Sequence, residues 1–151
     1  MAKNLINDNF LLIEGDILTD EHALDQFVDG KNQMAVSAYK PFMDGTVVTK
    51  SSSNKIERIV LKSDIDSSIK LEETYKTVNI YGIHKQTFHN HIAPELKRII
   101  DSGKVNSYYE QAFAKLVNAR EVNFEAIDYS NLKWYEVDNE EDLIEAEKIF
   151  G

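Results

Sequence analysis

The chain has 151 residues, enough for one domain with a substantial hydrophobic core. Hydrophobic residues make up 42% of it and charged residues 28%, a balance typical of a globular protein. The formal net charge of −9 argues against a nucleic-acid backbone or an anionic membrane as partner, because both need a basic face. The sequence has no cysteine, which excludes disulfides, thiolate catalysis and zinc–thiolate sites. No apolar run approaches the roughly 20 residues of a membrane helix, and residues 1–8 hold no signal-peptide core, so we expect a cytoplasmic protein.

Near the N-terminus, the apolar run Phe10–Ile13 is followed at once by Glu14-Gly15-Asp16. The run is too short for a helix and predicts a strand buried on both faces. The acidic residues then lie just past its carboxyl end, where ligands bind in open α/β sheets. A carboxylate there, beside a glycine that lets a ligand approach the backbone, suits a hard-metal ligand for a phosphate-bearing substrate. A strand followed by an acidic turn is the simpler alternative, and these residues alone leave it open.

Strands and helices alternate along the rest of the chain. Helical periodicity and capping residues predict helices at Ala23–Val28 with Asp20 or Thr19 as cap, at Thr87–Ser102 closed by Gly103, at Ser107–Asn118 with Ser107 as cap, and after the cap Asn139 with Leu143, Ala146, Ile149 and Phe150 inside. Short β-rich runs between turn signals predict strands at Met34–Tyr39, Thr46–Lys50, Lys55–Leu61, Tyr75–Ile83, Val122–Ile127 and Trp134–Val137. The pair Asp44-Gly45 is a turn signal between the first two of these strands. The chain shows no internal repeat or linker, so we predict one mixed α/β domain spanning residues 1–151.

A second acidic strand end lies near the C-terminus. Glu136 and Asp138 come at the end of the strand predicted from Trp134, and residues two apart on a strand face the same way. Together with Asp16 at a common sheet edge they would form a three-carboxylate pocket, in which like charges repel unless a cation lies among them. Oxygen-only ligands favour magnesium over zinc. Helix capping by Asn139 explains the acidic residues that follow it, but not the two that precede it.

Both acidic motifs resemble those of a known enzyme family. Glu14-Gly15-Asp16 and the run Trp134–Leu143 look like the two metal-binding motifs of nucleotidyltransferases, which join a nucleoside triphosphate to a phosphorylated sugar or alcohol. The intervening segments are similar to the branch that activates phosphocholine or 2-aminoethylphosphonate with CTP, often fused to a phosphoenolpyruvate mutase or an aminotransferase: Phe42–Val48, Tyr75–Tyr81, Pro94–Leu96 and Tyr108–Glu110. The resemblance covers Asn9 to Phe150, and it implies the C-terminal part of a Rossmann-like (GT-A-like) domain, with a mixed sheet flanked by helices.

One family feature has no counterpart here. Nucleotidyltransferases open with a strand and a glycine-rich loop, carrying an arginine and a lysine, that cradles the triphosphate. These 151 residues contain no Gly-x-Gly pair. The resemblance therefore implies that the N-terminal half of such a domain is absent, and we expect this chain to be inactive alone. The missing half would have covered apolar faces of the sheet, so we also expect Leu11 and Ile13 to be exposed or covered by another copy in a homo-oligomer.

The resemblance also implies the chemistry. A phosphate or phosphonate oxygen of the acceptor attacks the α-phosphorus of CTP and pyrophosphate leaves, with magnesium screening the anions. Asp16 and Asp138 are the expected catalytic metal ligands, with Glu136 as a third. Lys76 is expected to contact the acceptor's phosphonate, although a solvated lysine at a strand start is the alternative. The acceptor's cationic end would lie in a box of aromatic and acidic side chains, namely Tyr108, Tyr109, Glu110 and Trp134, with Asp44 as a further candidate.

Some alternatives stay open from the sequence. Packing of Tyr109 in the core is at least as plausible as a substrate contact. A sugar-1-phosphate nucleotidyltransferase would keep both metal motifs but would need partners for sugar hydroxyls where this chain offers aromatic and acidic residues. A chain without its triphosphate loop could instead be an assembly or regulatory module without catalysis. Magnesium-dependent turnover, once a nucleotide-binding half is supplied, separates the enzyme from the module.

Overall fold

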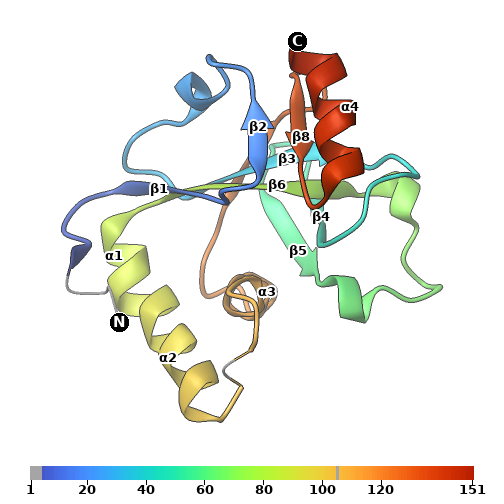
Figure 1. The fold of residues 1–151 in the computed structure, drawn as a ribbon. Helices are drawn as coiled ribbons and strands as arrows, with labels where there is room; N and C mark the ends of the chain where they lie inside the picture. The colour runs from blue at the N-terminus through green and yellow to red at the C-terminus, as the bar shows by residue number, and fades with distance from the viewer. Residues whose placement is uncertain (1–4, 105) are drawn as a thin grey trace.

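The computed structural model describes residues 5–104 and 106–151, and its centre is a six-stranded mixed sheet (Figure 1). Five of the strands follow one another across the sheet in the order β5 (Ile56–Val60), β4 (Val47–Lys50), β6 (Tyr75–Ile83), β3 (Gln33–Ala38) and β7 (Glu125–Asp128). The sixth strand, β1 (Phe10–Ile13), pairs with β6. A separate two-stranded sheet joins β2 (Ile17–Thr19) to β8 (Trp134–Glu136). The predicted mixed α/β class is confirmed.

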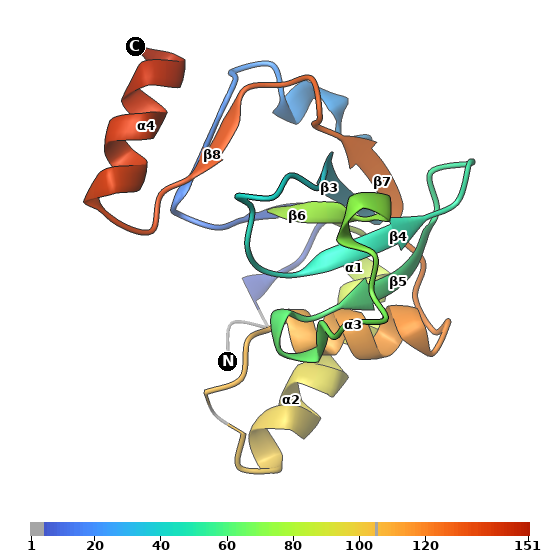
Figure 2. The same cartoon turned by 90° about the vertical axis from the view of Figure 1, so that its right-hand side faces the viewer.

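The helices between β6 and β7 lie on one face of the large sheet, and the small sheet lies on the other (Figure 2). On one face a continuous helical segment runs through α1 (Lys85–Thr87), a π-helical turn (Phe88–Ile92) and α2 (Ala93–Asp101), and packs beside α3 (Glu110–Asn118). On the other face β2, β8 and a 3₁₀ turn (Leu24–Gln26) cover a smaller core. Alternation along β3 supplies both cores, because Met34 and Val36 belong to the first and Ala35 to the second. The last helix, α4 (Glu140–Phe150), lies beside β8.

Most strands form where the sequence predicts them. The strands predicted from Met34, Thr46, Lys55, Tyr75 and Trp134 are confirmed to within one residue at each end. The β4–β5 meander is confirmed as an antiparallel pair. The turn at Asp44-Gly45 does not make a hairpin of β3 and β4, because β6 lies between them. The strand predicted at Val122–Ile127 begins instead at Glu125, since Val122 and Phe124 are buried in the core ahead of it.

The predicted helix starts are less accurate. The helix predicted at Ala23–Val28 is only a 3₁₀ turn without a side-chain cap, and α3 begins at Glu110, not at Ser107. Just before α3, the Tyr109 hydroxyl donates to Glu14 Oε1 at 2.6 Å. The Asn139 cap is confirmed, because its Oδ1 accepts from the backbone N–H groups of the next helix turn at 2.9 and 3.0 Å. The predicted interior of α4 is confirmed for Ala146 but is wrong for Leu143 and Phe150, which are exposed, while Ile149 is half-buried.

One contact between helices ties stability to pH. Glu95 on α2 is buried, and it accepts from Arg98 Nε at 3.0 Å and from Lys115 Nζ on α3 at 2.7 Å. Arg98 first, and then Lys115, lower the pKa of Glu95 from 4.5 to about 2. The stabilisation is therefore complete above pH 4.5 and is lost as the pH falls toward the folded-state value.

We expect Glu95→Gln to lower the free energy of unfolding at pH 7 by about 1–2 kcal/mol, because solvent screens the half-exposed Arg98 and Lys115. The difference from the parent should shrink between pH 4.5 and 2. Urea unfolding at several pH values measures this difference. A constant difference across the acid range would show that the Glu95 charge does not link α2 to α3.

Strand β1 is half open. The prediction that it is buried on both faces is wrong, because Leu11 and Ile13 are 40% and 43% exposed. Phe10 and Leu12 pack against the helical core, and the Phe10 ring lies 5.3 Å from that of Phe88. The exposure of Leu11 and Ile13 agrees with the alternative expectation that an absent layer leaves an apolar face. Among the described strands, only β6 pairs with β1.

We expect this face to drive self-association. Light scattering should give a dimer or larger species, because an open strand edge beside exposed apolar side chains invites pairing. The double variant Leu11→Lys/Ile13→Lys should shift it toward monomer, whereas Ile100→Lys on α2, an equally exposed apolar position, should not. A monomeric parent would contradict the expectation. None of the helices in the described part of the chain is long and apolar enough to cross a membrane.

Candidate functional site

The site lies at a gap in the sheet. Strand β3 pairs along one edge of β6, so β4 and β1 share the other edge. Strand β4 pairs with Tyr75 and Lys76, and β1 pairs with Ile80–Ile83. Two backbone hydrogen bonds close the ends of the gap. At one end the N–H of Thr77 donates to the Thr46 carbonyl at 3.1 Å, and at the other the N–H of Glu14 donates to the Asn79 carbonyl on β6 at 3.2 Å. A cavity of about 1090 Å³ opens above it.

All but one of the predicted site residues line this cavity. They are Asp16, Asp44, Lys76, Tyr108, Glu110, Trp134, Glu136 and Asp138. The exception is Tyr109, whose ring packs edge-on against Tyr81 and Phe113 at 5.9 and 5.4 Å. The predicted box of four residues around a cation is therefore not formed, because Tyr109 takes the core alternative.

The two acidic segments lie side by side, as predicted. Strands β2 and β8 pair antiparallel with Ile17 opposite Glu136, and the N–H of Val137 donates to the Asp16 carbonyl at 2.9 Å. Because the pairing is antiparallel, the start of β2 meets the end of β8, which brings Asp16 toward Asp138. Asp16 thus begins a strand of the small sheet and is separated from the end of β1 by the turn at Gly15.

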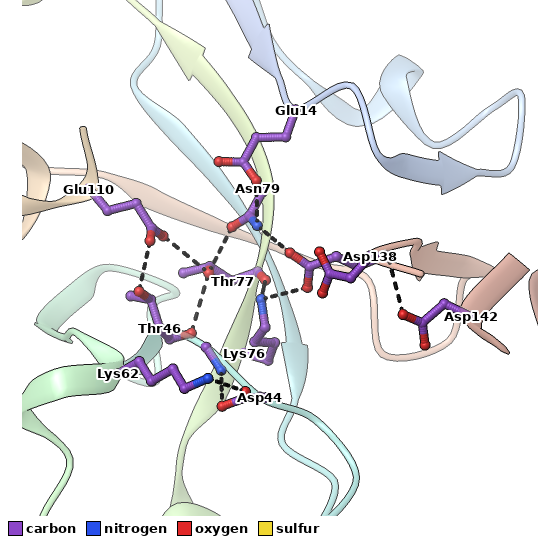
Figure 3. Close-up of polar contacts among 12 residues, drawn as sticks. Glu14, Asp44, Thr46, Lys62, Lys76, Thr77, Asn79, Glu110, Asp138 and Asp142 are labelled. Atoms are coloured by element: carbon purple, nitrogen blue, oxygen red, sulfur yellow. Dashed lines mark hydrogen bonds and ion pairs between the residues drawn. The ribbon is translucent and has the colours of Figure 1, made fainter. Parts of the chain in front are cut away.

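Asp16 carries the least satisfied polar atom of the site. Its Oδ1 is buried and has no hydrogen-bond partner among the described residues. A buried carboxylate oxygen without a donor is costly, so it calls for a cation or a water molecule. Asp138 is exposed, and its backbone N–H donates to Asp142 Oδ2 at 3.1 Å (Figure 3). Both side chains can therefore offer oxygen atoms to the cavity.

The predicted three-carboxylate metal pocket is not formed. No group of three or more acidic or histidine side chains among residues 5–104 and 106–151 could hold a metal ion. The reason is the third carboxylate, since Glu136 Oε1 accepts from Asn79 at 2.9 Å and its Oε2 lies 3.2 Å from Lys76 Nζ. Burial raises the pKa of Glu136, and Lys76 opposes that shift.

Lys76 is not the solvated lysine of the alternative reading. Only 3% of it is exposed, and its Nζ also donates to the Thr77 carbonyl at 2.8 Å. The turn at Gly45 covers it, where φ is +110° and a Cβ would lie 3.0 Å from Lys76 Cε. Glycine meets both requirements, a left-handed conformation and a close approach. Lys76 therefore lies in the wall of the cavity, paired with Glu136 on β8.

The proposed ammonium ligand Asp44 already has a cationic partner. Its Oδ2 pairs with Lys62, its Oδ1 accepts from Gly45 N at 2.8 Å, and its side chain is 71% exposed. The Lys62 ammonium group holds the pKa of Asp44 below its usual value. The two charges largely cancel at the cavity rim.

Comparisons with known proteins agree with this geometry. No protein-family model matches the chain. It is 24% identical over 153 residues to a CMP-5'-(3-aminopropyl)phosphonate synthase from Streptomyces rubellomurinus, an alignment covering 100% of this chain and 24% of that protein. A solved CTP:phosphocholine cytidylyltransferase from Streptococcus pneumoniae is similar with a TM-score of 0.72 and 13% identity, over 93% of this chain and 57% of that one. The fold is that of the nucleotidyltransferases.

A second solved member of this fold is similar over almost the whole chain. The inositol-1-phosphate CTP transferase from T. maritima has a TM-score of 0.64 and 18% identity, over 99% of this chain and 58% of that enzyme. The resemblance read from the sequence motifs is confirmed. The chain spans about a quarter of its curated relative and somewhat more than half of each of the two solved enzymes.

The nucleotidyltransferase fold also gathers polar residues that the sequence reasoning did not single out. Glu110 Oε2 accepts from the Thr46 hydroxyl at 2.8 Å (Figure 3). Its Oε1 accepts from the Tyr81 hydroxyl at 3.1 Å. Burial first, and then the Glu110 charge, raise the pKa of Tyr81 well above its usual value, so the phenol stays a donor. Asn79 lies at the centre of the network. One signal could have found it, because asparagine is uncommon inside a β-rich run.

Proposed function

We propose that this chain supplies the cation- and acceptor-binding half of a nucleotidyltransferase that transfers CMP from CTP to a phosphorylated amino alcohol or an aminoalkylphosphonate, releasing pyrophosphate. One observation carries the proposal: a single cavity holds both acidic segments, a buried lysine and aromatic side chains. The names of two similar proteins, a CMP-aminopropylphosphonate synthase and a phosphocholine cytidylyltransferase, support CTP as donor and a cationic acceptor.

The residues present fit a hard divalent cation. Asp16 offers a buried oxygen without a partner, and Asp138 offers an exposed carboxylate across the β2–β8 pair. Carboxylate oxygens with room for water are the ligands that Mg²⁺ prefers. Bound there, magnesium would supply charge screening between the α-phosphate and the attacking oxygen. We keep Glu136 out of this ligand set because both of its oxygens are already engaged.

The cavity can receive an acceptor with opposite charges at its two ends. Lys40 and Lys76 line it and can attract the phosphate or phosphonate group. Glu14 and Glu110 also line it, and among residues 5–104 and 106–151 their side chains accept only from amide and hydroxyl groups, which leaves their negative charge uncompensated. An ammonium group is the complement of such carboxylates, and the half-buried Trp134, which also lines the cavity, can add a cation–π contact.

Transfer requires that two anions approach in line. The protein's part is to hold the acceptor oxygen against the α-phosphorus and to neutralise charge as the pyrophosphate leaves. In this proposal Asp16 and Asp138 fix the cation, Lys76 orients the acceptor's anion, and the carboxylates hold its amino end. The resemblance to nucleotidyltransferases implies that the cytidine base is recognised by the nucleotide-binding half, outside this chain.

The test is a comparison of acceptors. A protein that contains this segment and a nucleotide-binding half is mixed with CTP, and pyrophosphate release is followed with phosphocholine, 2-aminoethylphosphonate or a sugar 1-phosphate. We expect release with one or both cationic acceptors. Release with the sugar 1-phosphate alone would assign the chain to sugar-phosphate transfer. No release with any acceptor and any nucleoside triphosphate would favour an assembly or regulatory module.

A further inference from the structure

Asn79 lies in the middle of β6 in a conformation that strands do not use. Its φ is +60°, in the left-handed region, and only 6% of the residue is exposed. The other non-glycine residues with positive φ in the described part of the chain, Asn54 and Arg120, lie outside the strands. Asparagine tolerates this conformation better than most residues. Such a conformation persists only where the surrounding structure holds it, and it occurs often at functional sites.

This conformation accompanies a bulge at the gap in the sheet. Strands β3 and β6 pair at Met34 with Tyr81 and again at Val36 with Thr77, so a step of two residues on β3 matches a step of four on β6. The extra residues of β6 include Asn79 and lie between the part of β6 that pairs with β4 and the part that pairs with β1. A bulge of this kind re-aims a side chain, and here the re-aimed side chain lines the cavity.

The Asn79 amide joins one hydroxyl to two carboxylates. Its oxygen accepts from Thr77 Oγ1 at 3.0 Å. Its nitrogen donates to Glu14 Oε2 at 2.9 Å (Figure 3). It also donates to Glu136 Oε1 at 2.9 Å. Ionised carboxylates only accept, so the three partners together fix the orientation of the amide and use both of its N–H donors.

These two carboxylates belong to the two acidic segments. Glu14 lies two residues before Asp16, and Glu136 lies two residues before Asp138. The Asn79 carbonyl also accepts from the backbone N–H of Glu14 at 3.2 Å. One residue of β6 therefore holds both segments that carry the proposed cation ligands.

We propose that Asn79 is a positioning residue that sets the spacing of Asp16 and Asp138, an inference that rests on the proposed function. The amide bridges two carboxylates that would otherwise repel each other, and it ties both segments to the rigid sheet. Without it, the segments on either side of the β2–β8 pair lose their common anchor. Asn79 itself does not touch the cation or the substrate.

The test measures divalent-cation binding by this 151-residue chain. Mn²⁺, which accepts the same oxygen ligands as Mg²⁺, is titrated calorimetrically into the parent, Asn79→Gly and Asn54→Gly. Glycine keeps the left-handed backbone and removes only the amide, and Asn54 is a matched control outside the cavity with a φ of 61°. We expect Asn79→Gly to weaken Mn²⁺ binding at least about tenfold, as loss of a residue that orients metal ligands does, and Asn54→Gly to leave it unchanged.

A mutant cycle separates positioning from simple destabilisation. If Asn79 acts through Glu136, the double variant Asn79→Gly/Glu136→Gln should bind Mn²⁺ no more weakly than the worse single variant. If Asn79→Gly fails to fold, the same positioning role can be tested at Glu14, the other partner of the Asn79 amide. Glu14→Gln, which can still accept from Asn79, should keep Mn²⁺ affinity within about threefold, whereas Glu14→Ala should lose about tenfold.

The outcomes distinguish this inference from the proposed function. Parent-like Mn²⁺ affinity in Asn79→Gly, even with a lower melting temperature, would overturn the positioning role and leave the cation site standing. Additive losses in the cycle would overturn it as well. A parent chain that binds no Mn²⁺ would overturn the cation site and, with it, the role of Asn79.

Discussion

Asp16→Asn and Asp138→Asn should each lower turnover at least about 100-fold in a protein that joins this segment to a nucleotide-binding half. An amide in place of either carboxylate removes a full negative charge from the proposed cation site and would leave the α-phosphate poorly screened. At about 1.4 kcal/mol per factor of ten, the loss corresponds to roughly 3 kcal/mol of transition-state stabilisation. Pyrophosphate release at saturating CTP and acceptor measures it.

The control is a carboxylate-to-amide change outside the cavity. Asp101→Asn, at an exposed position of α2, changes the net charge by the same amount and should leave turnover unchanged. Added Mg²⁺ should partly restore the two site variants if they lose affinity for the cation. Turnover within about threefold of the parent for both Asp16→Asn and Asp138→Asn would remove these carboxylates from the mechanism.

The sequence predicts the strands well because their signal is local. Runs such as Tyr75–Ile83 combine β-branched and aromatic residues between clear turn residues, and the strand forms at those bounds. The Asn139 cap is equally local, since one side chain reaches two N–H groups of its own helix. Tertiary contacts decide the start of α3, because the Tyr109 hydroxyl reaches a carboxylate far away in the sequence.

The chemistry of the site could be predicted only in part. Acidic residues follow two apolar runs, at Asp16 and at Asp138. Carboxylates in such places are seldom buried in the core, and this pattern is enough to predict that the two segments meet. The pairing partner of each carboxylate could not be predicted. Glu136 has the spacing of a metal ligand, yet a buried lysine and an amide occupy its oxygens. Those contacts depend on the bulge at Asn79, for which the sequence has no periodic signal.

The half-open strand β1 shows why burial is harder to predict than secondary structure. Its four apolar residues predict burial on both faces, and the helical core covers only one. The apolar sequence is therefore suited to a strand covered on both faces, whereas the exposure of Leu11 and Ile13 shows that one face is uncovered in this chain. The difference between the two is the basis for expecting self-association.

The second large effect concerns stability. We expect Lys76→Met to lower the free energy of unfolding at pH 8 by about 3 kcal/mol, because it leaves the half-buried Glu136 carboxylate without its cation. Methionine fits the space beneath Gly45, so the change removes the charge with little loss of packing. Chemical unfolding monitored by circular dichroism measures the difference.

The pH dependence identifies the cause of that loss. Burial already raises the pKa of Glu136 above its ordinary value of 4.5, and without Lys76 it must rise further. A carboxyl group whose pKa is raised in the folded state contributes stability below its unfolded value and loses it as the pH rises through the folded value. The deficit of Lys76→Met should therefore be smaller at pH 5 than at pH 8. Adding Glu136→Gln should recover part of the stability at pH 8, since an amide can be buried without a cation. A deficit that is equal at both pH values, and is not relieved by Glu136→Gln, would mean that Lys76 stabilises the sheet by packing alone.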